Sequence, residues 1–267
     1  MYVKYILLFF TSVHLAWGNK NNLQFSGRIM GGELTEKNQF PHSVRLSVVT
    51  EDDFEYTCGG SLVAPLWVLT TGFCVVKKKH IDVLLGANKL GEGITIRSKK
   101  FFHHPKFEDF NFNYDLGLVQ LYSDPCDASI KPVRLLSFAQ AKKNWVNTLV
   151  QIPGWGYEHD AKTVSDVQRY VTMRVISNKQ CATHYEPDFI TPHTLCAVGD
   201  KNFTHTTCHG DSGNGLLITD TDGKFTQIAV ASFVSSASCS ESPAGFVKLI
   251  GQHLYWIEKA TGLQIHN

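Results

Sequence analysis

Residues 68–74 read VLTTGFC, and residues 208–214 read CHGDSGN. Each stretch contains a cysteine and lies beside a short apolar run. The second places Ser212 between an aspartate and a glycine, which makes this serine a candidate nucleophile. The first ends in Phe73 and Cys74 and offers no titratable base. Whether Ser212 can act as a nucleophile therefore depends on the absence of a base at Phe73.

Short segments with alternating apolar residues recur on both sides of these stretches. Glycine, proline, asparagine and aspartate separate the segments, and this pattern is typical of β-strands. The sequence therefore predicts an all-β fold built from many short strands. The segments that carry this prediction contain Val44, Leu46 and Val48; Ile81, Val83 and Leu85; Ile94 and Ile96; Leu116, Leu118 and Leu121; and residues 149–152, 167–175, 215–218 and 228–233.

The predicted strands fall into two halves of similar length. A mostly polar bridge, residues 137–147, separates the halves and is the expected connection between them. Two small barrels suit this spacing better than a single β-domain of the same length. We expect an N-terminal barrel over about residues 29–140 and a C-terminal barrel over about residues 148–250.

One helix is predicted, at the C-terminus over about residues 249–261. Ile250, Leu254 and Ile257 fall on one face of such a helix, so that face is expected to pack against a barrel. Gly262 follows, and a glycine just past the last turn is typical of a helix end.

Composition and charge restrict the classes of function. The chain has 267 residues, of which 43% are hydrophobic and 18% charged, and its formal net charge is +1. This composition is that of a globular protein and gives no electrostatic case for binding nucleic acid or an anionic membrane. No dinucleotide-binding or phosphate-loop motif occurs, and no two cysteines form the close pair that a zinc site usually needs. We expect neither cofactor nor metal.

The N-terminus has the organisation of a secretory signal peptide. Lys4 precedes an apolar run that extends to Leu15, and Ala16 and Gly18 are the small residues that signal-peptide cleavage requires. The run is too short to span a membrane. We therefore expect removal of residues 1–18 and a secreted, extracellular product.

Secretion favours disulfides as the state of the seven cysteines, because the extracellular compartment is oxidising. Cys126 is left over; it is expected to be a buried thiol, and the alternative is a bond to another chain, so the protein is expected to be a monomer unless Cys126 crosslinks it. The expected pairs are Cys58 with Cys74, Cys181 with Cys196, and Cys208 with Cys239.

Six ordered motifs resemble those of the chymotrypsin-type serine proteases, and the similarity runs from about Ile29 to Gly262. The segment from Ser232 to Phe246 is similar in particular to insect chymotrypsin and brachyurin-like enzymes. The resemblance implies two six-stranded antiparallel Greek-key barrels with a cleft between them, and an activation peptide, residues 19–28, removed by cleavage after Arg28. The motifs span residues 28–32, 58–62, 67–70, 115–118, 154–156 and 210–213.

The resemblance implies a catalytic serine at Ser212 and an orienting aspartate at Asp115. Where the family has alanine, alanine, histidine and cysteine, this chain has Thr71, Gly72, Phe73 and Cys74. A phenylalanine can neither accept the serine proton nor return one to the leaving amine. The predicted function is therefore that of a catalytically inactive homologue.

The alternative is an active chymotrypsin-like endopeptidase that retains activity through another base. A base must lie within hydrogen-bond reach of the serine. His80 is expected to be exposed, and His103 and His104 belong to an outer strand. His209 is close to the cleft but faces the substrate, so none of the four is expected to substitute.

The resemblance assigns further positions around the cleft. Gly210 and Ser212 would form the oxyanion hole with their backbone N–H groups, and Asp211 would pair with a new terminal ammonium on Ile29. This switch is either still used after cleavage or is inherited geometry without a present use. Asn214 and Gly215 follow the serine motif where active relatives have glycine and proline.

The substrate pocket is expected to be lined by Thr206, Val234 and Ala244. None of these is acidic, so the pocket would not hold an Arg or Lys side chain. Val234 replaces a glycine and is expected to narrow the entrance.

The partner expected from the resemblance is an extracellular protein: a protease, an inhibitor or a component of a proteolytic cascade. Asn202 begins the only glycosylation sequon, Asn202-Phe203-Thr204. Binding of carbohydrate or of a membrane surface is a weaker alternative, because no aromatic cluster or basic stripe supports it.

Overall fold

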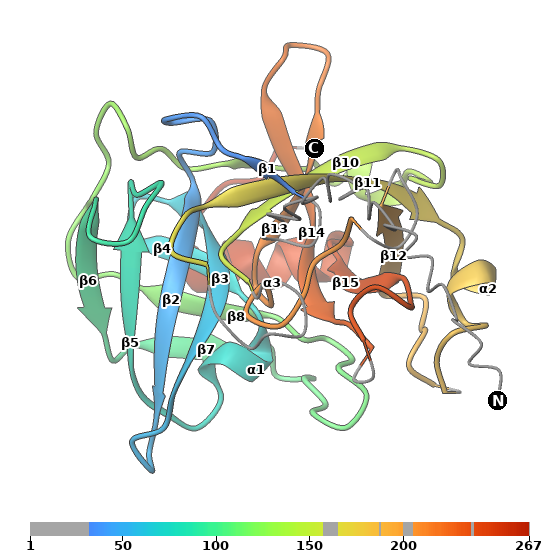
Figure 1. The fold of residues 1–267 in the computed structure, drawn as a ribbon, viewed down its shortest axis with the longest axis horizontal. Coiled ribbons are helices and arrows are strands. Elements are labelled where there is room, and N and C mark those ends of the chain that lie inside the picture. Colours follow the sequence, from blue (N-terminus) through green and yellow to red (C-terminus); the bar gives the residue numbers. More distant parts are fainter. Residues whose placement is uncertain (1–31, 157–164, 187, 200–204, 236–237, 267) are drawn as a thin grey trace, which may run out of the picture.

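A computed structural model shows two β-barrels side by side, the N-terminal one coloured blue to green and the C-terminal one yellow to red (Figure 1). The predicted signal peptide, the activation peptide with Arg28 and Ile29, and the sequon at Asn202 lie outside the described residues. The structure describes residues 32–156, 165–186, 188–199, 205–235 and 238–266.

The elements follow one another as short strands with few helices, as the alternating pattern predicts. The strands are β1 (Glu33–Leu34), β2 (Ser43–Thr50), β3 (Glu55–Ala64), β4 (Trp67–Thr70), β5 (Lys78–Leu85), β6 (Ile94–Ser98), β7 (Phe101–His103), β8 (Gly117–Gln120), β9 (Arg134–Leu135), β10 (Leu149–Gly154), β11 (Arg169–Ile176), β12 (Thr194–Gly199), β13 (Gly215–Thr219), β14 (Phe225–Phe233) and β15 (Ala244–Lys248). The helices are α1 (Gly72–Val75), α2 (Asn178–Cys181), α3 (Gly251–Thr261) and a 3₁₀ turn at Gln140–Lys142.

The N-terminal barrel closes because one strand pairs with two neighbours in succession. Its strand order is β6-β5-β2-β3-β4-β8-β7. β6 and β7 are separated only by Lys99 and Lys100, so they form one bent strand that pairs first with β5 and then with β8. The Ser98 hydroxyl donates to the carbonyl of Gln120 at 2.7 Å and ties the bend to β8.

The C-terminal barrel repeats this topology. Its strands follow the order β11-β10-β13-β14-β15-β12, and a further β11–β12 pairing closes the ring. In both barrels the fourth strand returns to pair with the first, which is the Greek-key arrangement. The prediction of two six-stranded barrels is therefore confirmed, with β1 and β9 added to the second barrel as short extra strands.

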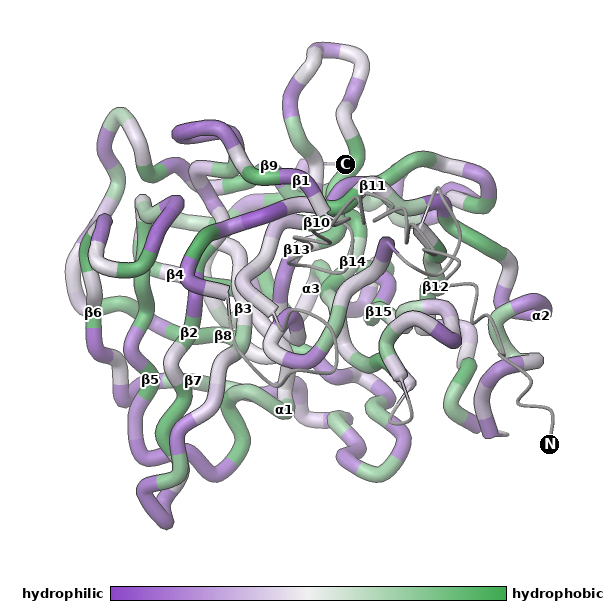
Figure 2. The backbone as a smooth tube through the Cα atoms, viewed as in Figure 1, coloured by the Kyte–Doolittle hydropathy of each residue, from purple (hydrophilic) through white to green (hydrophobic). Residues whose placement is uncertain are grey.

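Alternate residues of the strands fill the barrel interiors. In β2, Val44, Leu46 and Val48 are at most 1% exposed, whereas the residues between them are partly exposed. Hydrophilic colour gathers on the turns, and the turn of residues 51–53 between β2 and β3 is purple (Figure 2). Period-two burial of this kind fixes the strand register, because a shift by one residue would expose the apolar set.

The chain crosses between the barrels earlier than the sequence suggested. β9 already pairs with β14, and Trp145 belongs to the buried apolar cluster that β14 helps to form. Within residues 137–147, Ala141 and Trp145 are therefore packed on the C-terminal barrel, while Lys142, Lys143 and Asn144 between them are exposed. Val133 and Ala141 also join this cluster, and such single buried apolar residues give too weak a pattern to indicate packing.

The C-terminal helix is confirmed as α3. Leu254 and Ile257 are fully buried, and Gly262 ends the helix with a φ of 74° while its N–H donates to the carbonyl of Glu258. Ile250 precedes the first helical turn instead of lying within it. Within the described ranges, no helix combines the length and apolar character needed to cross a lipid bilayer.

Three disulfides form between the expected partners: Cys58 with Cys74, Cys181 with Cys196, and Cys208 with Cys239. The prediction of a buried thiol at Cys126 is wrong, because this residue is exposed. It follows Pro125 in a loop where its backbone N–H donates to Asp124, so the side chain does not enter either core.

The packing of the N-terminal barrel is tested by Leu46→Ala. Leu46 is fully buried, so we expect the free energy of unfolding to fall by about 2–5 kcal/mol through lost burial and the cavity that remains. Phe54→Ala is the control, because Phe54 is 66% exposed on the same barrel and its removal should change stability by less than about 0.5 kcal/mol. Urea unfolding measures both values. Equal losses for the two variants would contradict the assignment of the core.

Candidate active site

Four residues from the two barrels meet at their junction. Phe73 lies on α1 and Asp115 just before β8, so both come from the N-terminal barrel. Ser212 precedes β13 and Ser232 lies in β14, so both come from the C-terminal barrel. The structure thus brings together the predicted nucleophile, the predicted orienting acid and the phenylalanine in the position of the base.

Asp115 is a fully buried carboxylate with donors on both oxygens. Its Oδ1 accepts the backbone N–H of Phe73 at 2.9 Å, and its Oδ2 accepts the hydroxyl of Ser232 at 2.6 Å. The backbone of Gly72 also donates to it. These donors are neutral, so the carboxylate has hydrogen bonds without a compensating positive charge.

Burial dominates the acidity of this group. Removal from water raises the pKa of Asp115 to about 7, against the lowering effect of the bonds from Ser232, Phe73 and Gly72. A nearby cation would favour the ionised form, and the histidine implied by the resemblance would supply one when protonated. Phe73 supplies none.

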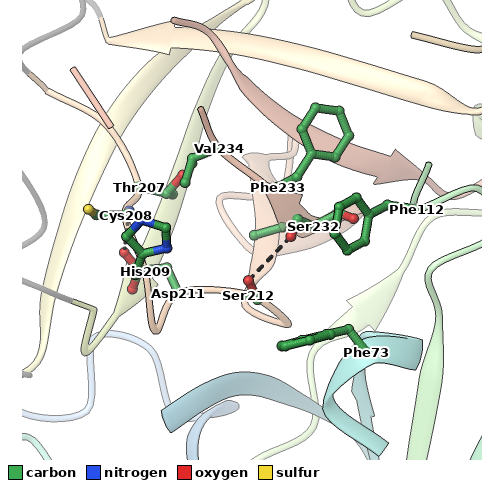
Figure 3. Close-up of a pocket in the computed structure, with 11 residues that line it drawn as sticks. Phe73, Phe112, Thr207, Cys208, His209, Asp211, Ser212, Ser232, Phe233 and Val234 are labelled. Atoms are coloured by element: carbon green, nitrogen blue, oxygen red, sulfur yellow. Dashed lines mark hydrogen bonds between the residues drawn. The ribbon is translucent and has the colours of Figure 1, made fainter. Parts of the chain in front are cut away.

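The Ser212 hydroxyl is turned toward the C-terminal barrel. It donates to the carbonyl of Ser232 at 3.2 Å, the bond drawn as a dashed line in Figure 3. The Ser212 carbonyl accepts the N–H of Gly59 at 2.8 Å, which ties the serine turn to β3. The hydroxyl proton is therefore directed at a backbone oxygen, which is not basic enough to remove it.

The Phe73 side chain forms a wall of the cleft and is 43% exposed. Its ring centroid lies 5.6 Å from that of Tyr56, and the Lys78 ammonium lies 5.5 Å from the Phe73 ring centroid. The Tyr56 hydroxyl donates to the Phe73 carbonyl at 3.4 Å. The ring thus has a defined place beside Tyr56 and Lys78, in front of Ser212.

Of the histidines considered as substitute bases, His80 lies in β5 and is half-buried, not exposed as predicted. His104 stacks on Tyr114 and contacts Trp256, with ring centroids 5.0 and 5.1 Å apart, and the ring of His103 contacts the carbonyl of His104. His209 lines the same cavity as Ser212 but stands apart from the serine in Figure 3. In the described part of the chain, the groups that donate to Asp115 come from Gly72, Phe73 and Ser232.

The backbone before the serine forms a tight turn. Gly210 has a φ of 92°, a conformation that residues other than glycine rarely adopt, and it precedes Asp211 and Ser212. The amides of Asp211 and Gly213 donate to the carbonyls of Cys208 and Ala231. Among the described backbone–backbone hydrogen bonds, none uses the N–H of Gly210 or Ser212.

The cleft contains a cavity of about 270 Å³. Val234 lines it and packs against the Cys208–Cys239 disulfide, whereas Thr206 and Ala244 are each 1% exposed and are not among its walls. Two of the three predicted pocket residues therefore lie outside the lining. The lining residues are Phe73, Phe112, Thr207, Cys208, His209, Asp211, Ser212, Ala231, Ser232, Phe233 and Val234.

Sequence reasoning missed the aromatic wall made by Phe112 and Phe233, whose rings stack with centroids 6.0 Å apart. Phe112 has a φ of 56° and lies between Asn111 and Asn113. An aromatic residue between two turn-forming asparagines is a signal that could have indicated an exposed ring at the cleft.

No three His, Cys, Asp or Glu side chains gather in a way that could hold an ion, over the ranges that the structure describes.

Two Greek-key barrels with a serine and a buried aspartate at their junction are the fold and arrangement of the chymotrypsin class. The trypsin family profile matches residues 29–257. The chain is 31% identical to a collagenase of Hypoderma lineatum, over 89% of this chain and 88% of the relative, and 31% identical to a brachyurin of Leptuca pugilator, over 88% and 99%. It is also similar to a solved structure titled HL collagenase, with a TM-score of 0.80, 29% identity, and coverage of 88% of this chain and all of the other. The chain belongs to the trypsin family.

The uncompensated carboxylate of Asp115 predicts a pH dependence of stability. An acid whose pKa rises to about 7 on folding binds more protons in the folded than in the unfolded chain between about pH 4 and pH 7, so its contribution to stability is lost as the pH rises through this range. Relative to Asp115→Asn, the unchanged protein should lose up to about 4 kcal/mol between pH 4 and pH 8.

Urea unfolding of both proteins at several pH values measures this difference. Asp52→Asn, in the exposed turn between β2 and β3, controls for the loss of one negative charge. A difference between the Asp115→Asn variant and the unchanged protein that stays constant with pH would contradict the assignment.

Proposed function

We propose that this protein is a secreted, catalytically inactive member of the trypsin family that acts by binding another protein. One observation carries the proposal of inactivity: at the position of the base, a backbone N–H and not an imidazole meets Asp115, while Ser212 donates to Ser232. A serine without a base to take its proton is a poor nucleophile at neutral pH. Six cysteines in disulfides support secretion, because such bonds persist in oxidising compartments.

A binding role is supported by the apolar surface that the cleft presents. Phe54, Tyr56 and Phe73 form a row on the N-terminal barrel, with successive ring centroids 6.3 and 5.6 Å apart. Phe73 is also a wall of the cavity, whose other side is made by Phe112 and Phe233. We call this continuous surface, formed by these five residues, the aromatic cleft.

The aromatic cleft favours a protein partner. Exposed apolar patches of this kind mark interaction sites, and aromatic residues contribute most of the binding energy in many interfaces. The cavity of about 270 Å³ has room for one large apolar side chain, and the row beyond Phe73 offers a second contact. The partner class that fits is an exposed protein segment with apolar side chains, on a protease, an inhibitor or a component of a proteolytic cascade.

Inactivity is tested with the variant Phe73→His. We expect no labelling of Ser212 by a fluorophosphonate probe in the unchanged protein after cleavage behind Arg28, and labelling with casein hydrolysis in the variant. In subtilisin, loss of the catalytic histidine lowers turnover by roughly 10⁶-fold, so restoring a histidine here should raise the rate by at least about 100-fold. Recovery should be partial, since Val234 still lines the cavity.

The double variant Phe73→His, Ser212→Ala is the control and should be inert. Labelling and turnover by the unchanged protein would instead establish the alternative, an active chymotrypsin-like endopeptidase. Recovery to the full activity of intact relatives would contradict the expected effect of Val234.

Binding through the aromatic cleft is tested with a short labelled peptide that carries one phenylalanine, compared with the same peptide carrying aspartate there. Fluorescence anisotropy should show binding of the first peptide only. Phe73→Asp should weaken this binding at least about tenfold, because an aromatic contact is replaced by a charge. Phe102→Asp is the matched control: Phe102 is 48% exposed, close to the 43% of Phe73, but lies on β7 and not in the cleft. Equal effects of both substitutions would argue against a role of the cleft.

A further inference from the structure

Asp211 is a second buried carboxylate beside the cleft. It is 1% exposed, and it lies between Gly210 and Ser212 in the turn that carries the serine. Its Oδ1 accepts the N–H of Gly156 at 2.9 Å and its Oδ2 that of Cys208 at 3.0 Å. Burial raises the pKa of Asp211 to about 7 despite these bonds. The backbone of Trp155 also donates to it, so this carboxylate connects the turn that carries Ser212 to the segment that follows β10.

Asn214 supplies the side-chain donor to this carboxylate. Its Nδ2 lies 3.3 Å from Asp211 Oδ1, and its backbone N–H donates to the Asp211 carbonyl at 3.1 Å. Asn214 is fully buried, so water does not compete for this contact. Asparagine stands here where relatives with intact motifs have glycine, which has no side chain to donate.

Two glycines make room for the asparagine. A Cβ atom on Gly59 of β3 would lie 2.0 Å from Asn214 Oδ1, and one on Gly154 of β10 would lie 2.5 Å from Asn214 Nδ2. The amide is thus held between strands of both barrels. Its Oδ1 has no hydrogen-bond partner in the described chain, which is unfavourable by about 1–3 kcal/mol for a buried group. The unpaired Oδ1 opposes the burial of Asn214. Its other polar atom, Nδ2, makes a hydrogen bond to Asp211.

The turn that follows Asp211 makes three backbone hydrogen bonds, to Gly59 and to Ala231. The Ser212 carbonyl accepts from Gly59, the Gly213 N–H donates to Ala231, and the Asn214 carbonyl accepts from Ala231. Asp211 and Asn214 together close this network around the serine.

We propose that Asn214 is a positioning residue that holds Asp211, and with it the Gly210–Ser212 backbone, in the cleft-forming conformation before the chain is cleaved after Arg28. The family resemblance assigns this task to the terminal ammonium of Ile29, which exists only after cleavage. In this protein the asparagine performs it within the intact chain, so the cleft is formed without processing. The inference concerns when the cleft forms and goes beyond the proposed function, because it holds whatever the cleft binds.

Hydrogen–deuterium exchange of the amides of residues 209–215, before and after cleavage behind Arg28, tests the proposal. Arg28→Gln keeps the chain uncleaved in the first set of samples. Exchange of residues 44–48, in the core of the N-terminal barrel, is the internal reference, and the ratio of the two segments is the measured quantity. In the unchanged sequence this ratio should differ by less than about twofold between the uncleaved and cleaved proteins.

In the uncleaved chain, Asn214→Gly should raise the ratio at least about tenfold, the factor that corresponds to about 1.4 kcal/mol. Cleavage should return it to within about twofold of the unchanged protein, because the new ammonium then supplies the missing partner. Asn214→Ala removes the donor without adding backbone freedom and should shift the ratio in the same direction. A merely space-filling role for Asn214 would not be rescued by cleavage.

Two results would overturn the proposal. The first is an exchange ratio in the uncleaved Asn214→Gly variant equal to that of the uncleaved protein with Asn214. The second is a ratio in the uncleaved protein with Asn214 that is tenfold higher than in the same protein after cleavage. Neither readout depends on peptide binding or hydrolysis, so the proposed function can fail while this inference stands, and the reverse.

Discussion

The buried carboxylate of Asp115 is the group on which the arrangement of the two barrels at the cleft depends. One oxygen accepts from Phe73 on α1 of the N-terminal barrel, and the other from Ser232 on β14 of the C-terminal barrel. A carboxylate removed from water is strongly unfavourable unless donors reach it. Among these donors only Ser232 belongs to the other barrel, so a shift of one barrel against the other would leave Oδ2 without its hydrogen bond. The relative position of α1 and β14 follows from this constraint.

This constraint does not require a histidine. The donor at position 73 is a backbone N–H, which every residue except proline provides, so the frame of the cleft is independent of the side chain there. The Phe73 side chain is free to face the cleft, where it contacts Tyr56 and lies near Lys78. The architecture around Ser212 therefore persists with a phenylalanine at position 73.

Strand alternation predicted an all-β fold of many short strands in two halves, whereas the two six-stranded Greek-key barrels were implied by the family resemblance. The closing strand was not predicted as one unit, because Lys99 and Lys100 break its apolar pattern at the bend between β6 and β7. The inward packing of Trp145 and the exposure of Cys126 depend on tertiary contacts that a local pattern does not contain. At the site, the motifs placed Ser212 and Asp115, whereas the aromatic wall of Phe112 depends on a left-handed backbone conformation that sequence alone leaves open.

A protease needs both a rigid cleft and a reactive serine. In this cleft the two properties depend on different groups. The frame of the cleft is held by Asp115 and Asp211, whose donors are backbone amides and neutral side chains. The donors to Asp115 come from both barrels, and those to Asp211 come from the C-terminal barrel. Reactivity needs one imidazole, which Phe73 does not supply. Asn214 fits against Gly59 at a distance that leaves no space for a side chain at position 59, and Gly59 belongs to the motif over residues 58–62 that the chain shares with the family. A cleft built in this way can lose its base and keep its shape, because no part of the frame depends on the proton transfer that the base would perform.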